Sequence, residues 1–205
     1  MKLITASAAI LAATPDLELL IEQAGRVCYK SEERTAPGSA EKLIRNLMDK
    51  HHESVLEHGS ITVRFICDRG VSHELVRHRI ASFSQESTRY CNYGAEKHGG
   101  EVSFIDIRGG FPEMNATSHS RWIESMGHAE AMYLDMIRAG STAQEARSVL
   151  PNSVKTEVVM TANPREWRHV FKLRASAAAH PQMREVINPL LETFKAAWPI
   201  LFGDL

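Results

Sequence analysis

RHRIASFSQES, residues 77–87, is the stretch that decides how the rest of this chain is interpreted. Two arginines flank His78, and side chains with short hydroxyl, amide and carboxyl groups follow. Arginine forks match phosphate geometry better than lysine does, and the short polar groups suit the edges of a ring. On a helix, Arg77 and Arg79 would point about 200° apart with His78 between them, so at least one of the three faces inward or into a cleft. The segment therefore predicts an anion site. The alternative is a helix end whose cations lie near the terminal carbonyls.

The composition favours a single globular domain, residues 1–205. Hydrophobic residues make up 43% of the chain and charged residues 24%, as in ordinary soluble proteins. The net charge of -1 gives no overall attraction to nucleic acid or to an anionic membrane, so we expect neither as a partner. The three cysteines, Cys28, Cys67 and Cys91, form no CxxC pair. This pattern suits the reducing cytoplasm, which is where we expect the protein.

The first residues resemble a weak secretory signal, but a helix start is the better interpretation. Thr14, Pro15 and Asp16 follow the order of an N-cap, a first-turn proline and a first-turn acid. No apolar run approaches the roughly 20 residues that span a bilayer. We therefore expect a chain without a membrane segment.

Hydrophobic periodicity predicts an α+β domain with a mixed sheet flanked by helices. The predicted strands cover residues 3–10, 61–68, 101–107 and 153–162. The predicted helices cover residues 15–28, 40–51, 70–82, 118–139, 141–149, 164–178 and 182–198. Few βαβ units are apparent, and no GxGxxG follows a strand, so the dinucleotide-binding Rossmann fingerprint is absent.

Other familiar site motifs are also absent. The chain has no GxxxxGK[ST] loop and no GxSxG elbow. The sequence therefore predicts neither a P-loop nucleotide site nor a serine nucleophile for acyl transfer. The histidines of HELVRH, His73 and His78, are five residues apart. On a helix they would lie about 140° apart, unlike the pair of a zinc HExxH motif. His51, His52 and His58 have no cysteine partner, so we expect no metal.

An arginine falls on the apolar stripe of the helix predicted at 164–178. The stripe comprises Trp167, Val170, Phe171 and Ala178. Arg174 lies in line with it, whereas Arg168 and Lys172 are expected to face away. A guanidinium on a buried stripe needs a partner. Either an internal acid or a bound ring or anion could provide one.

The start of the same helix carries a second candidate anion site. In TANPREW, Asn163 is predicted as the N-cap, Pro164 as the first helical residue, and Arg165 follows. Capping is the default role, but a helix N-terminus with an arginine also suits a pyrophosphate. Arg147, in EARSVLP, has the pattern of an ordinary surface charge.

RHRIASFSQES resembles the signature of the flavin-dependent thymidylate synthases. HHESVLEHGSITVRF resembles the segment that precedes the signature in that family. RSVLPNSVKTEV resembles the family's Arg-x-x-Leu-Pro element, and TANPREWRHVFKLR resembles its Asn-x-Arg to Leu-Arg helix. The resemblance covers about residues 20–195, in the family's order.

The resemblance implies an FAD enzyme that makes dTMP from dUMP. Methylenetetrahydrofolate would be the carbon donor and NADPH the reductant, and the reduced flavin would deliver hydride to the uracil ring. The family's α/β fold lacks a Rossmann fingerprint and forms a homotetramer with shared active sites. Arg174 would activate the uracil ring, because a fixed cation stabilises charge that develops there.

The resemblance also implies the binding residues. Those for FAD are Ser54, Arg77, His78, Arg79, Gln85, Asn163, Arg165 and His169, with His52 and His180 as weaker candidates. Those for dUMP are Glu74, Leu75, Val76, Arg77, Gln85, Glu86, Ser87, Thr88, Arg89, Arg147 and Arg174. Glu74 stands where many members carry Gln, and a small insertion before His180 makes its alignment with the family ambiguous.

Three rival interpretations accompany this one. Cys91 beside Arg89 could instead act as a thiolate that adds to the uracil ring. A non-enzymatic module could use the arginines of residues 77–89 on nucleic-acid phosphates, but no aromatic residues alternate with them. A histidine metal hydrolase is the third alternative.

Overall fold

The computed structural model describes all 205 residues. Its helices are α1 (Leu17–Val27), α2 (Ser39–Asp49), α3 (Arg69–Leu75), α4 (Ala116–Arg138), α5 (Ala143–Ala146), α6 (Pro164–Arg174), α7 (Pro181–Ala197) and α8 (Pro199–Phe202). Its strands are β1 (Lys2–Ile4), β2 (Ser7–Ala13), β3 (Ile61–Asp68), β4 (Ser82–Gln85), β5 (Ser103–Ile105) and β6 (Lys155–Ala162). Five short 3-10 turns are η1 (Glu32–Arg34), η2 (Glu53–Glu57), η3 (Glu96–His98), η4 (Ile107–Gly109) and η5 (Arg147–Val149).

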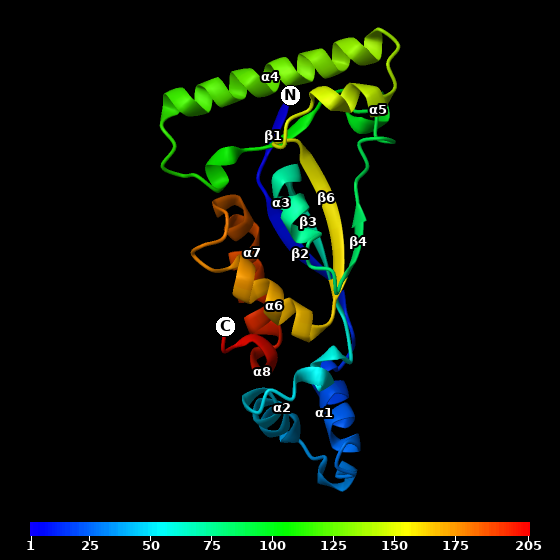
Figure 1. The fold of residues 1–205 in the computed structure, drawn as a ribbon, viewed down its shortest axis with the longest axis vertical. Coiled ribbons are helices and arrows are strands. Elements are labelled where there is room, and N and C mark those ends of the chain that lie inside the picture. The colour runs from blue at the N-terminus through cyan, green and yellow to red at the C-terminus, as the bar shows by residue number, and fades with distance from the viewer. The chain divides into compact units, whose positions relative to one another are not determined.

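The strands form two sheets, and the α+β prediction is confirmed (Figure 1). One sheet has the strand order β2-β3-β6-β4, and the other pairs β1 with β5 in parallel. In the larger sheet, β3 and β6 alternate between buried and less buried positions. This period of two is what a strand with one well-covered face requires.

The chain divides into two compact units. Unit 1 comprises residues 1–7, 65–77 and 84–158, and unit 2 comprises residues 8–64, 78–83 and 159–205. The helices of unit 1 are α3, α4 and α5, and those of unit 2 are α1, α2, α6, α7 and α8. None of the helices is both long enough and apolar enough to span a membrane.

Unit 1 has a hydrophobic core beneath α4. The core residues are Tyr93, Val102, Phe104, Met126, Tyr133, Ala146 and Val154. The hydroxyl group of Tyr133 accepts a hydrogen bond of 3.1 Å from the backbone N–H of Tyr93. α4 contacts α5, and the two run near each other in Figure 1. The core therefore fixes the chain just after the signature segment.

Unit 2 is built on an aromatic cluster that holds α6, α7 and α8 together. Its rings are Trp167, Phe171, Phe194, Trp198 and Phe202. Offset and edge-on ring contacts of this kind add to the free energy gained by burial. The indole N–H of Trp167 donates to the carbonyl of Ile61 at 3.0 Å. α6 is thus anchored along its buried face.

The largest departure from the sequence prediction lies in residues 70–82. α3 ends at Leu75, and Ser82–Gln85 form β4 instead of continuing the helix. The backbone N–H of Glu86 also bonds to the carbonyl of Glu157, at 2.9 Å. Pairing with β6 satisfies backbone groups that a helix would otherwise satisfy. Arg77 and Arg79 therefore do not lie on a helix, and the 200° argument does not apply.

Smaller departures concern the N-terminal region. The single strand predicted at 3–10 is two strands, β1 and β2. α1 begins at Leu17 with Asp16 at the N-cap position, so the prediction of Thr14 as N-cap is wrong. The Thr14 hydroxyl accepts a hydrogen bond from the backbone N–H of Ser60 at 2.9 Å. The Thr14 hydroxyl is therefore bonded to a residue distant in the sequence and does not cap the helix.

Candidate functional site

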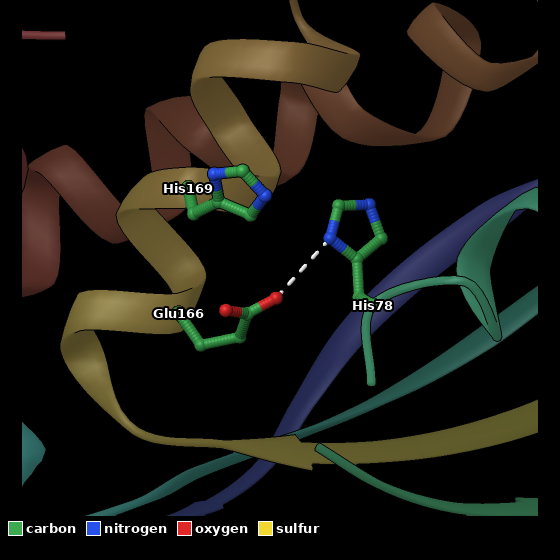
Figure 2. A group of neighbouring side chains, drawn as sticks. All are labelled: His78, Glu166 and His169. Atoms are coloured by element: carbon green, nitrogen blue, oxygen red, sulfur yellow. Dashed lines mark hydrogen bonds and ion pairs between the residues drawn. The ribbon is translucent and has the colours of Figure 1, made fainter. Parts of the chain in front are cut away.

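His78, in unit 2, contacts three polar residues of α6, of which Glu166 and His169 are drawn in Figure 2. Its Nδ1 lies 3.2 Å from Oε1 of Glu166. Its Nε2 lies 3.1 Å from Nε of Arg174. The His78 and His169 rings meet edge-on, with centroids 5.6 Å apart. His78 is only 4% exposed. The histidine of the signature, and neither flanking arginine, is therefore the residue that points inward.

The contacts of His78 determine where its proton lies. An arginine Nε–H can only donate, so Nε2 of His78 accepts and Nδ1 carries the proton. Nδ1–H then donates to the Glu166 carboxyl group. Burial lowers the pKa of His78 to about 4, and the charges of Arg174 and His169 act in the same direction. At neutral pH the contact with Glu166 is a hydrogen bond of a neutral imidazole and not an ion pair.

His78, Glu166 and His169 also have a spacing that a metal ion can use. Their potential ligand atoms lie within 4.8 Å of one another. However, both ring nitrogens of His78 have hydrogen-bond partners, and one of them is the cation Arg174. A metal would have to displace these contacts and lie near a fixed positive charge. The arrangement favours orienting Arg174 over binding a metal.

A pocket of about 440 Å³ lies beside this cluster in unit 2. Its lining residues are Glu53, Glu57, Ile80, Asn163, Arg165, Glu166, Arg168, His169 and Lys172. Arg165 bonds to Glu57 at 2.6 Å and approaches Glu53 at 3.4 Å. The hydrogen bond to Glu57 raises the pKa of Arg165. The pocket therefore holds an arginine at the first turn of α6 that is ion-paired with two glutamates of the same lining.

Two predictions for α6 have different outcomes. Asn163 is the N-cap, as predicted, and its Oδ1 accepts from the backbone N–H of Glu166 at 2.8 Å. The prediction that Arg168 faces away is wrong, because this side chain is buried. Arg168 donates to both carboxylate oxygens of Asp204 at 2.6 Å and also to the carbonyl of Leu201.

The predicted apolar stripe is correct only in part. Trp167, Val170 and Phe171 are buried, but α6 ends at Arg174 and Ala178 is exposed. Arg174 itself is half-buried. It lies at the end of the stripe and not within it, which explains how a guanidinium is tolerated there.

In unit 1, Gln85 belongs to a buried hydrogen-bond network. Its Nε2 donates to the Ser72 hydroxyl at 2.9 Å and to the Thr156 hydroxyl at 3.2 Å. Ser72 and Thr156 are fully buried. The Gln85 side-chain nitrogen is therefore committed to protein partners.

Glu86 is held in a similar way. The Tyr93 hydroxyl donates to its Oε1 at 2.8 Å, and the Lys155 ammonium donates to its Oε2 at 2.9 Å. Lys155 also donates to Glu157 at 2.6 Å. Burial raises the pKa of Tyr93, and the negative charge of Glu86 raises it further. Both oxygens of Glu86 are occupied, so its side chain braces the segment that follows.

The rest of the signature forms a turn. The Ser87 hydroxyl accepts from the backbone N–H of Arg89 at 3.3 Å, and the backbone N–H of Cys91 donates to the carbonyl of Ser87. Thr88 is buried, and Arg147 reaches its hydroxyl at 3.4 Å. Arg147, which has the sequence pattern of a surface charge, thus lies next to the signature.

Comparison with known proteins identifies the family. The family model described as thymidylate synthase complementing protein matches residues 9–200. The chain is 33% identical to the flavin-dependent thymidylate synthase of Geobacter sulfurreducens over 210 residues, covering 96% of this chain and 85% of that protein. It is 34% identical to the protein of the same name from Corynebacterium efficiens over 206 residues, covering 91% and 79%. The protein of that name from Mycobacterium tuberculosis H37Rv is 34% identical over 198 residues, covering 90% and 78%.

This chain belongs to the flavin-dependent thymidylate synthase family. The resemblance of the signature and of the segments around it is thereby confirmed. The candidate residues of this family member fall in both units. Ser54, His78, Arg79, Asn163, Arg165, His169 and Arg174 belong to unit 2, and Glu74, Leu75, Val76, Arg77, Gln85, Glu86, Ser87, Thr88, Arg89 and Arg147 belong to unit 1.

The exposure of the candidate residues differs widely. The exposed ones are Ser54, Val76, Arg77, Arg79, Arg89, Arg147 and His169. Leu75 is fully buried, so only its backbone could contact a ligand. Glu74 and Cys91 are partly buried. His180 caps α7, because its Nδ1 accepts from the backbone N–H of Gln182 at 3.3 Å.

Sequence reasoning missed Glu166, Tyr93 and Lys155 in this family member. Glu166 lies in the first turn of α6, where an acid is common for reasons of the helix dipole alone. Its spacing of three residues before His169 was the available signal, since such residues share a helix face. Tyr93 and Lys155 reach Glu86 from positions 7 and 69 residues away. No local pattern marks these contacts.

Proposed function

We propose that this protein is an FAD-dependent thymidylate synthase that converts dUMP to dTMP. Methylenetetrahydrofolate donates the one-carbon group and NADPH the electrons, so the products are dTMP, tetrahydrofolate and NADP⁺. The proposal draws on the names of the relatives and on one structural observation. Arg174 is half-buried and is held by a neutral His78 that is itself bonded to Glu166.

The pocket beside α6 supports flavin binding. Asn163, Arg165 and His169 line it. Lys172 offers donors to a pyrophosphate, and Arg165 would do so by exchanging its pairs with Glu53 and Glu57. Its volume of about 440 Å³ lies in the lower part of the range for ligand pockets. Such a space suits part of a dinucleotide, as expected if the exposed Ser54, Arg77 and Arg79 act across subunits. The ring of His78 and the side-chain nitrogen of Gln85 are already bonded within the chain. When bound, reduced flavin supplies the reducing equivalents.

The candidate residues of unit 1 have the charge and hydrogen-bonding groups that binding of dUMP requires. Arg77, Arg89 and Arg147 are exposed, and guanidinium forks match a phosphate in shape and charge. Gln85 and Glu86 are immobilised by buried partners. We propose that they fix the backbone from Glu86 to Arg89 against the uracil edge and the ribose, with Glu74–Arg77 completing the site. Ser87 serves as a binding hydroxyl and not as a nucleophile.

Arg174 is the residue proposed for catalysis. A fixed guanidinium beside the uracil stabilises negative charge that develops in the ring as it is reduced. The neutral imidazole of His78 accepts from Arg174 without competing for that charge. The last turn of α6 also favours a cation, because the helix dipole is negative at its C-terminal end.

Residues 1–205 are proposed to act as one functional domain in a cytoplasmic homotetramer. The family model covers residues 9–200, which include parts of both units. Shared active sites would explain why candidate residues for FAD and for dUMP are divided between the two units. Light scattering of the purified protein should give about four times the mass of the 22.9 kDa chain.

The visible absorbance of the purified protein tests the proposal first. We expect an oxidised-flavin spectrum that changes when dUMP is added, followed by dTMP formation when methylenetetrahydrofolate and NADPH are supplied together. Leaving out either one should abolish turnover. A protein that neither takes up FAD nor binds dUMP would overturn the proposal. Strongly salt-dependent binding to DNA or RNA would then favour the binding-module alternative.

A further inference from the structure

We propose that Glu166 is a positioning residue for Arg174 and acts through His78. The inference rests on the proposed function, because it assigns a task within the same site. Glu166 does not contact Arg174 in the hydrogen bonds that connect the three residues. Instead Glu166 accepts from Nδ1–H of His78, and Nε2 of His78 accepts from Nε–H of Arg174.

The direction of each hydrogen bond is fixed by chemistry. Arginine has no acceptor, so the Arg174 contact requires a lone pair on Nε2 of His78. A neutral imidazole with a lone pair on Nε2 must carry its proton on Nδ1. That proton needs an acceptor, because His78 is only 4% exposed. Glu166 supplies the acceptor, at 3.2 Å.

The chain of hydrogen bonds also restrains the plane of the Arg174 guanidinium. A guanidinium is rigid and planar, so a bond to Nε constrains the direction of the whole fork. The His78 ring can hold Nε only if its own rotation is blocked. Glu166 on one side and the edge-on His169 ring on another limit that rotation (Figure 2). Without Glu166, the ring could turn and leave Arg174 misaligned.

Two substitutions separate this role from general support of α6. Glu166→Ala removes the acceptor, whereas Glu166→Gln keeps a carbonyl oxygen that can accept from Nδ1–H. Asp204→Ala is the matched control, because Asp204 also contacts α6, through Arg168, and lies outside the His78 contacts. All three are compared with the flavin-loaded wild-type protein.

We expect Glu166→Ala to lower kcat about tenfold, because small misplacements of a catalytic group cost that much or more. The KM for dUMP and the flavin content should stay within about twofold of wild type, since binding groups are retained. Glu166→Gln should keep at least about half of kcat. Asp204→Ala should lower the unfolding temperature and leave kcat within about twofold. Wild-type kcat in Glu166→Ala, or an equal loss in Glu166→Gln, would overturn the proposal.

Nitrogen-15 NMR of the imidazoles provides a readout that does not depend on turnover. In the wild-type protein, His78 should show a protonated Nδ1 and an unprotonated Nε2. Glu166→Ala should give a mixture of tautomers, and Glu166→Gln should resemble wild type. If Glu166→Ala does not fold, an Nε2–H tautomer in the unmodified protein still refutes the proposal. A wild-type protein with the Nδ1–H tautomer of His78 but no dTMP formation would refute the proposed function alone.

Discussion

In unit 1, both carboxyl oxygens of Glu86 accept hydrogen bonds from buried or half-buried groups. In unit 2, by contrast, Arg174 is half-buried at the end of α6, and its Nε donates a hydrogen bond to His78. The first arrangement fixes the side chain of Glu86 through a partner on each oxygen. The second keeps a cation in place near the surface of its unit. The contrast is between a carboxylate held at both oxygens and a half-buried cation held at its Nε by a histidine.

The largest effect expected in this comparison comes from Arg174→Ala. Loss of a fixed donor to developing charge should lower kcat for dTMP formation by about 10³-fold. Flavin absorbance should remain near wild type, because Arg174 is not among the proposed flavin contacts. Lys195→Ala is the control, since Lys195 forms only an exposed pair with Glu192 on α7. Retained turnover in Arg174→Ala would show that Arg174 is not the catalytic residue.

The second prediction concerns pH and His78. Its folded pKa is about 4 instead of 6.5, so between these values the unfolded chain binds a proton that the folded chain does not. The free energy of unfolding should therefore fall as pH drops from 6.5 to 4, by about 3 kcal/mol from this group. Urea titrations at several pH values within this range measure the change.

His78→Gln is the control for the pH effect. Glutamine offers an amide donor to Glu166 and a carbonyl acceptor to Arg174, but it does not titrate. The variant should lose less stability over the same pH range than the wild-type protein does. Identical pH profiles would show that His78 is not the group responsible.

Tyr93→Phe tests how far the hydrogen bond from Tyr93 stabilises Glu86 in unit 1. The substitution leaves Oε1 of Glu86 without the Tyr93 hydroxyl, which should cost about 1–2 kcal/mol of stability. The KM for dUMP should rise several-fold, while flavin absorbance should not change. Tyr29→Phe, at a site 66% exposed, is the matched control and should have neither effect. An altered flavin content in Tyr93→Phe would contradict the proposed assignment of Glu86 to the dUMP site.

The smallest effect is expected at Asn163. Asn163→Ala removes the N-cap of α6 and should cost about 1 kcal/mol, whereas Asn163→Asp keeps an acceptor for the Glu166 N–H and should cost less. Thermal unfolding measures both. Flavin content then separates two tasks, because only the amide of asparagine can donate to a ligand. Full flavin loading in Asn163→Asp would show that capping is the main role of this side chain.

The parts of the fold that sequence could predict are those with a strong local pattern. Residues 61–68 are a strand with the predicted bounds, β3, and Asn163 caps α6 as predicted. Each has its signal within a few neighbouring residues. β4 is different, because Ser82–Gln85 becomes a strand only by pairing with β6. Tertiary pairing of this kind overrides local preference and leaves no pattern in the segment itself.

The same division holds for the candidate site. The signature, Arg174 and Asn163 could be found from residue types and spacing. Arg168 was misplaced because its partner, Asp204, is 36 residues further along the chain. Glu166 was missed because its partner, His78, is 88 residues away. The roles that depend on a second, distant residue require the folded structure.

Arg174 is the last residue of α6, and this position has a thermal consequence. Terminal turns of helices open locally at lower free energy than the whole domain. The nearest aromatic ring before it on α6 is Phe171, which packs against Trp167, Phe194 and Phe202. Heating should therefore loosen the turn that carries Arg174 before the aromatic cluster separates. Enzymatic activity should then decline several degrees below the temperature at which the chain unfolds.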